Sequence, residues 1–185
     1  VKSYLEDIND FQSNTETFVA IRANIDNWRW AGVPFYLRTG KRLSKKHSEI
    51  VINFKNIPHN IFPNSKPIVN NKLIISLQPE ERIELVQTVK IPGPGGYRYK
   101  PTSLVLDYST SFQDRLPEAY ERLLIDVIRG NQTLFMRKDE VEASWTWIDT
   151  ITKYWKETKM TNNLYNAGTT GPGDKILIDG HTWNI

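Results

Sequence analysis

The chain has 185 residues, of which 39% are hydrophobic and 24% are charged, and its 24 basic and 21 acidic residues give a net charge of +3. This length and composition predict one globular domain over residues 1–185, long enough to close its own core. The absence of cysteine excludes disulfides and thiolate metal sites, and no apolar run reaches the roughly 20 residues of a membrane-spanning helix, so we expect a cytoplasmic protein with no membrane partner.

Alternating apolar residues predict about six β-strands in the first 110 residues. The apolar positions of the strands are, in chain order, Val19/Ile21/Ala23/Ile25, Val33/Phe35/Leu37, Ile50/Ile52/Phe54, Leu73/Ile75/Leu77, Ile83/Leu85/Val89 and Leu104/Leu106/Tyr108. Short connections without a helix favour an antiparallel sheet, and the first two strands should pair with each other. The polar residues that alternate with the apolar ones indicate that one side of the sheet meets water or a partner.

A helical period replaces the alternation after residue 114. The first predicted helix lies between Pro117 and Gly130, with an apolar stripe formed by Tyr120, Leu123, Leu124, Val127 and Ile128. A second helix should begin at Asp139, with Glu142 completing a capping box, and continue to Trp155. The predicted fold class is therefore α+β, a large and mostly antiparallel β-sheet covered on one face by helices. The polar, glycine-rich tail from about Asn162 should be ordered only where it docks.

A basic loop, residues 38–46, follows the second predicted strand. It carries five cations in nine residues, and no acidic residue occurs between Asp26 and Glu49. Such concentrated charge fits a small anion better than a nucleic acid. Lys41 and Lys46 are placed to converge on a phosphate, and Gln78, at the end of its strand, is placed to reach the same side. A solvated basic turn explains the charge equally well on its own.

Other chemistry is sparse in the sequence. His47, His59 and His181 lack metal-ligand spacing, so each is predicted to be structural or superficial, with His47 of interest because it adjoins the basic loop. The Pro/Gly segment 92–96 is not followed by a helix start, so it reads as a structural loop. An alternative function is a non-enzymatic polyanion-binding module that uses the 38–46 loop, with six tryptophans and eight tyrosines as stacking surfaces. Most of these aromatic residues fall at predicted core positions, which weighs against it.

Two long segments, residues 26–43 and 117–135, resemble bacterial glucose-6-phosphate dehydrogenases. The resemblance includes Leu77-Gln78-Pro79 and the helix start at 139–145, and it covers nearly the whole chain. It implies the C-terminal part of such an enzyme, whose mostly antiparallel sheet forms a homodimer through its outer face. The chain starts at Val1 rather than Met, in keeping with a piece of a longer protein.

The resemblance also implies roles for single residues. Lys41 and Lys46 match positions that contact glucose 6-phosphate, and Gln78 matches a further polar position of the substrate region. Arg38 matches a cation of a structural NADP site found in some members. At another position of that site, this chain has Ser76 where those members have an arginine. The nucleotide fingerprint and the catalytic histidine belong to an N-terminal Rossmann domain outside this chain. The implied activity is NADP-dependent oxidation of glucose 6-phosphate to 6-phosphogluconolactone, the first step of the pentose phosphate pathway, and the chain alone should be inactive.

Overall fold

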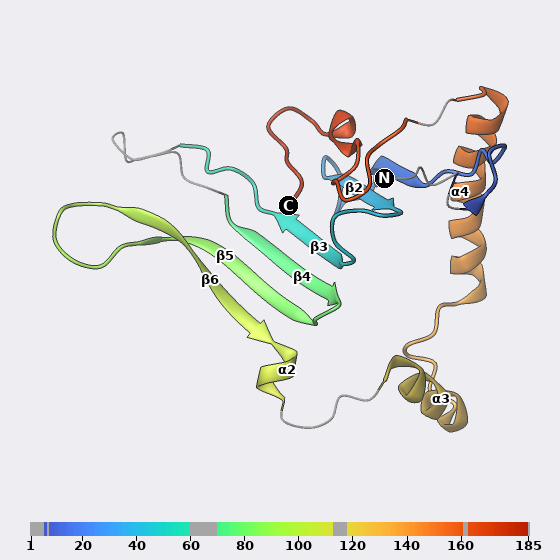
Figure 1. The fold of residues 1–185 in the computed structure, drawn as a ribbon. Coiled ribbons are helices and arrows are strands. Elements are labelled where there is room, and N and C mark those ends of the chain that lie inside the picture. The colour runs from blue at the N-terminus through green and yellow to red at the C-terminus, as the bar shows by residue number, and fades with distance from the viewer. Residues whose placement is uncertain (1–5, 7, 60–69, 113–117, 161–162, 185) are drawn as a thin grey trace. The chain divides into compact units, whose positions relative to one another are not determined.

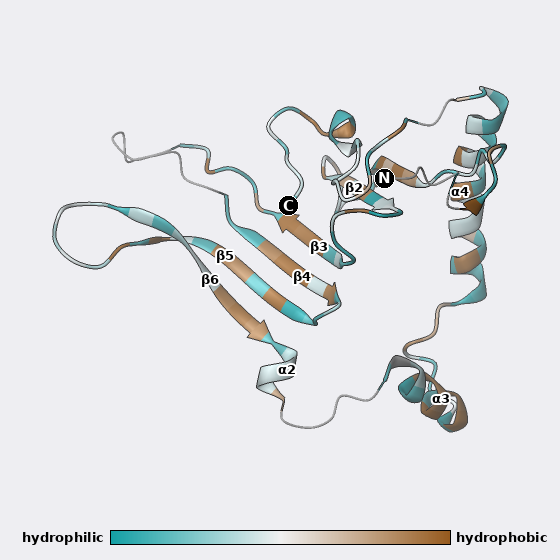
Figure 2. Ribbon diagram, in the orientation of Figure 1, coloured by the Kyte–Doolittle hydropathy of each residue, from teal (hydrophilic) through white to brown (hydrophobic). Residues whose placement is uncertain are grey.

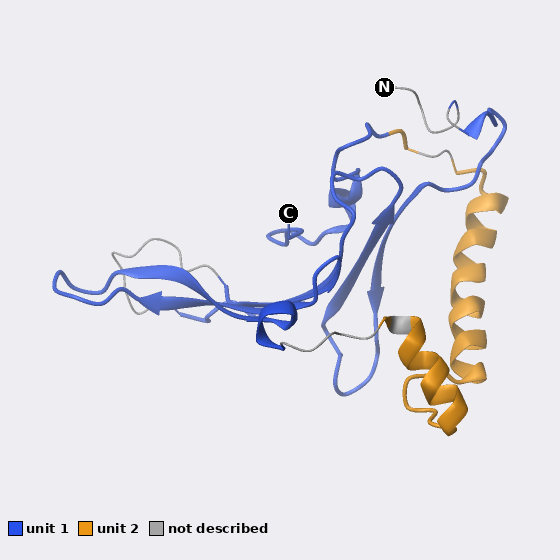
Figure 3. Cartoon of the chain, turned by 60° about the horizontal axis from the view of Figure 1, so that its bottom comes forward, with its two compact units in different colours: residues 1–113, 165–185 blue, residues 114–164 orange. Residues whose placement is uncertain are grey.

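The structure, a computed structural model, describes residues 6, 8–59, 70–112, 118–160 and 163–184. These residues belong to two compact units (Figure 3). One unit comprises residues 1–113 and 165–185, and the other comprises residues 114–164. The predicted helix-start residue Pro117 lies outside the described residues.

The larger unit contains six antiparallel strands, as the alternation predicts. They are β1 (Phe18–Asn24), β2 (Pro34–Gly40), β3 (Ser48–Asn53), β4 (Lys72–Gln78), β5 (Arg82–Lys90) and β6 (Tyr99–Asp107) (Figure 1). The first two strands pair with each other, as expected, and the other four form a sheet in the order β3-β4-β5-β6. Every pairing is antiparallel, which confirms the α+β class, but the strands form two sheets where we expected one.

The division into two sheets has its cause in the connection between β2 and β3 and in the contacts of that connection with the C-terminal segment. Arg42 has a φ of 51°, a left-handed conformation that interrupts an extended ladder. The Ser44 N–H then donates to the Thr169 carbonyl at 2.9 Å, and the Gly168 N–H donates to the Arg42 carbonyl at 2.9 Å. The loop therefore uses the returning C-terminal segment, and not another strand, as its hydrogen-bonding partner.

The four-stranded sheet has two chemically different faces. Directly opposed residues form two aliphatic rows on one face, here called the aliphatic face: Ile52/Leu73/Leu85/Leu104 and Ile50/Ile75/Ile83/Leu106. The other, here called the mixed face, carries the row Val51/Ile74/Glu84/Val105 together with Arg82 and Ser103. Figure 2 shows the hydrophobic bands along β3, β4 and β6.

The expected closed core is not found among the described residues. Ile74, at 8% exposure, is their one buried hydrophobic side chain, whereas Leu104 is 65% exposed. A sheet one layer thick buries neither face by itself, so the aliphatic face requires a second layer. Coverage by the helices of the other unit stays a prediction.

The smaller unit contains the two predicted helices, α3 (Ala119–Arg129) and α4 (Lys138–Glu157). Gly130 ends α3 with a φ of 67°, as predicted. The predicted start of α4 is wrong by two residues, because the cap is Arg137, whose N–H donates to Glu140 Oε2 at 3.1 Å. The Asp139 carboxylate is instead held by the Arg137 guanidinium at 2.6 and 2.9 Å. Neither helix, nor any other in the described part of the chain, is long and apolar enough to cross a membrane.

Two short helices complete the larger unit, α2 (Tyr108–Ser111) and the 3-10 turn η1 (Gly173–Ile176). Asp107 caps α2, because its carboxylate accepts from the Ser109 hydroxyl at 2.6 Å and the Thr110 N–H at 3.2 Å. These two hydrogen bonds lower the pKa of Asp107. The η1 turn belongs to the tail and packs on β1.

Gly171 gives a test of this docking. A methyl group at residue 171 would overlap the ring of Phe18 on β1, whereas a methyl group at Gly168 would meet no atom within 4 Å. Both glycines have left-handed φ values, 76° and 79°, so the backbone penalty of alanine is shared. We expect Gly168→Ala to cost roughly 1 kcal/mol of unfolding free energy and Gly171→Ala roughly 2–4 kcal/mol in urea titrations. Equal losses would mean that the tail does not pack on Phe18.

Candidate functional site

The basic loop begins at the end of β2, and its three lysine side chains are exposed. Lys41 directly follows β2, and the side chains of Lys41 and Lys46 are exposed. Within the described part of the chain, no carboxylate forms a salt bridge with either lysine. Two ammonium groups without an acidic partner are available to an anion from solution.

The backbone of this loop is held at several points. The Lys41 N–H donates to the Thr17 carbonyl at 2.8 Å, and the hydrogen bonds of Arg42 and Ser44 to residues 168 and 169 follow directly. A solvated turn without function needs no such anchoring from a segment more than a hundred residues away. The anchored backbone therefore favours a binding loop over a loose basic turn.

Strand pairing brings Gln78 to the Lys46 end of the loop. Gln78 is the last residue of β4 and lies opposite Ser48, the first residue of β3. Lys46 precedes Ser48 by two residues, and the Gln78 side chain is exposed. The register thus places Gln78 and Lys46 at the same end of the β3–β4 pair.

Arg38 faces the C-terminal segment of the chain. Its guanidinium carbon lies 4.5 Å from the centre of the Trp183 ring, and its Nη1 donates to the Thr170 carbonyl at 3.5 Å. Tyr36 lies two residues earlier on the same face of β2. Its hydroxyl oxygen accepts the Ile178 N–H at 3.2 Å and lies 2.8 Å from His181 Nδ1. No local sequence signal identified His181 and Trp183 as partners of β2, because both lie in a tail of low periodicity.

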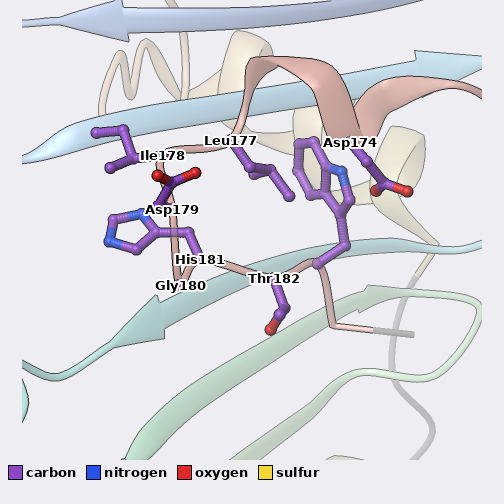
Figure 4. Close-up of a pocket in the computed structure, with 8 residues that line it drawn as sticks. Asp174, Leu177, Ile178, Asp179, Gly180, His181 and Thr182 are labelled. Atoms are coloured by element: carbon purple, nitrogen blue, oxygen red, sulfur yellow. The ribbon is translucent and has the colours of Figure 1, made fainter.

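A hollow of about 400 Å³ lies along this C-terminal segment (Figure 4). It is lined by Asp174, Leu177, Ile178, Asp179, Gly180, His181, Thr182 and Trp183. The lining contains two carboxylates and neither lysine nor arginine, so its charge disfavours a phosphate. Lys41, Lys46 and Gln78 lie outside it, and the candidate anion site is therefore the exposed loop and not this hollow.

The described residues offer little other site chemistry. No group of three histidine, aspartate or glutamate side chains among them is arranged to hold a metal ion. His47 Nε2 lies 3.8 Å from Glu49 Oε1, and the Asn184 amide donates to both oxygens of that carboxylate at 3.3 Å. Glu49 therefore ties His47 and the tail to the start of β3.

Comparison with known proteins gives a consistent set of relatives. The profile of the family described as glucose-6-phosphate dehydrogenase, C-terminal domain, matches residues 1–183. Glucose-6-phosphate 1-dehydrogenase of Rhizobium meliloti (strain 1021) is 55% identical over 188 residues, and that of Mycolicibacterium smegmatis (strain ATCC 700084 / mc(2)155) is 53% identical over 191 residues. Both matches span 100% of this chain but only 38% of the relative.

Solved structures agree with these relatives. A glucose-6-phosphate dehydrogenase in complex with its substrate glucose-6-phosphate superposes with a TM-score of 0.84 at 34% identity, over 94% of this chain and 36% of that protein. Glucose-6-phosphate 1-dehydrogenase from Mycobacterium avium gives a TM-score of 0.78 at 29% identity, over 99% of this chain and 38% of that protein.

Proposed function

Because the chain belongs to the family of glucose-6-phosphate dehydrogenase C-terminal domains, we propose that it acts as the C-terminal part of a glucose-6-phosphate dehydrogenase. The observation that carries this proposal is the family match over residues 1–183. The two relatives named above are whole enzymes in name, and the chain spans 38% of the length of each. The whole enzyme oxidises glucose 6-phosphate to 6-phosphogluconolactone with NADP, in the cytoplasm, as the first step of the pentose phosphate pathway. The relatives give no support to a polyanion-binding module.

We assign the phosphate of glucose 6-phosphate to Lys41 and Lys46. One relative is described in complex with this substrate, both lysines here are exposed, and the Lys41 backbone is held by the Thr17 carbonyl. Two ammonium groups favour the doubly charged phosphate through charge-assisted hydrogen bonds. The Gln78 amide supplies a neutral donor and acceptor beside Lys46, suited to a sugar hydroxyl.

The remaining chemistry belongs to an N-terminal Rossmann domain of the whole enzyme. NADP supplies the hydride acceptor when bound, and a general base must remove the proton of the substrate hydroxyl at C1. The chain has neither the strand, glycine-rich turn and helix that bind a dinucleotide nor a histidine with a matching motif. Lys41 and Lys46 contribute by holding one end of the substrate in place.

The family resemblance connects Arg38 with a structural NADP site. Its guanidinium is already used within the chain, by the ring of Trp183 and the carbonyl of Thr170. A phosphate at this position would have to share or replace those contacts. The carboxylates of Asp174 and Asp179 line the adjoining hollow and oppose a second anion, so the residues present fit this group poorly.

We assign the homodimer contact to the mixed face of the four-stranded sheet. Both oxygens of the Glu84 carboxylate have partners on this face, Arg82 Nη2 at 3.3 Å and the Ser103 hydroxyl at 2.6 Å. A carboxylate that is already paired costs less to remove from water. Val105, 54% exposed in the same row, supplies apolar surface of the kind found in interface centres.

The isolated 185-residue chain should not reduce NADP in the presence of glucose 6-phosphate. The reason is the location of the general base and the nucleotide fold in the rest of the enzyme. The measurement is the near-ultraviolet absorbance of NADPH, with the whole enzyme as the positive control. Turnover by the purified chain would contradict the proposed division of labour.

In the whole enzyme, Lys41→Ala should raise the KM for glucose 6-phosphate roughly 10- to 100-fold, because one charged contact to phosphate contributes about 1.5–3 kcal/mol. Lys175→Ala removes an exposed lysine of η1 and serves as the charge-matched control. Steady-state kinetics at fixed NADP measure both variants. An unchanged KM for Lys41→Ala would remove this lysine from the phosphate site.

Val105→Lys should weaken dimerisation of the whole enzyme by roughly 100-fold or more, because it places an unpaired charge in the interface. Thr102→Lys makes the same change on the opposite face of β6 and should leave the dimer intact. Sedimentation velocity over a dilution series measures the monomer–dimer equilibrium. Dissociation by Thr102→Lys alone would assign the contact to the aliphatic face instead.

A further inference from the structure

We propose that Tyr165 is a positioning residue that fixes Lys41 for phosphate binding, an inference that rests on the proposed function. Tyr165 lies in the segment that returns from the smaller unit to the larger one. Neither its sequence neighbourhood nor its spacing from the basic loop indicates a role at that loop. Its hydroxyl nevertheless lies against the backbone of Lys41.

The Tyr165 hydroxyl bridges two backbone carbonyls. It lies 2.7 Å from the carbonyl oxygen of Lys41 and 3.0 Å from that of Thr17. Its single proton is donated chiefly to the nearer oxygen, Lys41, with Thr17 as the second acceptor. The Lys41 N–H also donates to the Thr17 carbonyl. The N–H and the carbonyl of Lys41 are therefore both held, one by the Thr17 carbonyl and the other by the Tyr165 hydroxyl.

The ring of Tyr165 keeps the hydroxyl in place. It is half-buried and packs against Phe18, with ring centroids 5.4 Å apart and planes inclined at 58°. Phe18 is the first residue of β1 and lies opposite Gly40, the residue before Lys41. The hydroxyl is therefore positioned from the same strand pair that delivers Lys41.

The conformation after Lys41 explains why this bond matters. The Lys41 carbonyl forms the peptide unit that precedes Arg42, whose φ of 51° is unfavourable for a residue with a side chain. Tyr165 holds the carbonyl on one side of Arg42, and the Gly168 N–H holds the Arg42 carbonyl on the other. These two bonds stabilise a loop conformation that the local sequence does not favour.

A fixed backbone is what a lysine needs to act as a phosphate ligand. Its long side chain has four rotatable bonds, and each further degree of freedom in the backbone widens the range of positions that the ammonium group can occupy. Binding energy lost in ordering the loop would appear as a higher KM for glucose 6-phosphate. The chemical step, carried out elsewhere in the enzyme, would change little.

The test is Tyr165→Phe in the whole enzyme, which removes the hydroxyl and keeps the ring. We expect the KM for glucose 6-phosphate to rise roughly five-fold, with kcat and the KM for NADP within about two-fold of the parent enzyme. Tyr108→Phe is the matched control, because Tyr108 is also half-buried, stacks on Phe112 at 5.4 Å, and has no hydroxyl hydrogen bond within the described residues. An unchanged KM in Tyr165→Phe, or an equal rise in both variants, overturns the proposal.

A double substitution separates positioning from a general structural role. If Tyr165 acts through Lys41, adding Tyr165→Phe to Lys41→Ala should raise the KM no further than Lys41→Ala alone. Multiplied effects would overturn the proposed link. A normal KM in Lys41→Ala would overturn the phosphate assignment itself, whereas a raised KM there with no effect of Tyr165→Phe would overturn only the role of Tyr165.

Discussion

The return of the C-terminal segment to the first strand pair is the constraint on which the candidate site depends. Residues 165–171 supply hydrogen bonds to the carbonyls of Lys41 and Arg42 and to the N–H of Ser44. The loop between β2 and β3 is too irregular to satisfy these groups by a strand ladder of its own. Without the segment, the backbone groups of the loop would turn to water, and the left-handed Arg42 would have little to hold it.

This arrangement separates the charge of the loop from its shape. The charge is local, because five cations lie within residues 38–46. The shape is nonlocal, because Tyr165 contacts Lys41 across 124 positions of the sequence. Arg38 is held by the ring of Trp183 and the carbonyl of Thr170, whereas the three lysines of the loop, Lys41, Lys45 and Lys46, are exposed. Exposed lysines are suited to a phosphate that arrives from solvent.

Sequence reasoning was most accurate where a signal is local. The strands and their antiparallel pairing follow from period-2 alternation, and the end of α3 follows from Gly130, a residue that adopts a left-handed conformation easily. The start of α4 was misplaced because Asp139 is by type the better cap, yet its carboxylate binds the Arg137 guanidinium. The two-sheet arrangement and the role of Tyr165 depend on contacts between distant segments, for which a single sequence contains no local pattern.

The aliphatic face of the four-stranded sheet leaves much of its apolar surface exposed. The aliphatic face presents eight branched side chains in two rows, and Leu104 and Leu106 are 65% and 42% exposed. Helix α3 of the smaller unit also exposes apolar side chains: Tyr120, Leu124, Val127 and Ile128 are between 61% and 84% exposed. Apolar surface of this extent on both kinds of element is stable only when covered. The mixed face, whose one carboxylate in the central row is already paired, tolerates a polar and partly hydrated contact. The two faces therefore differ in their need for a second layer, and the continuous aliphatic face is the one that loses more free energy when it stays in water.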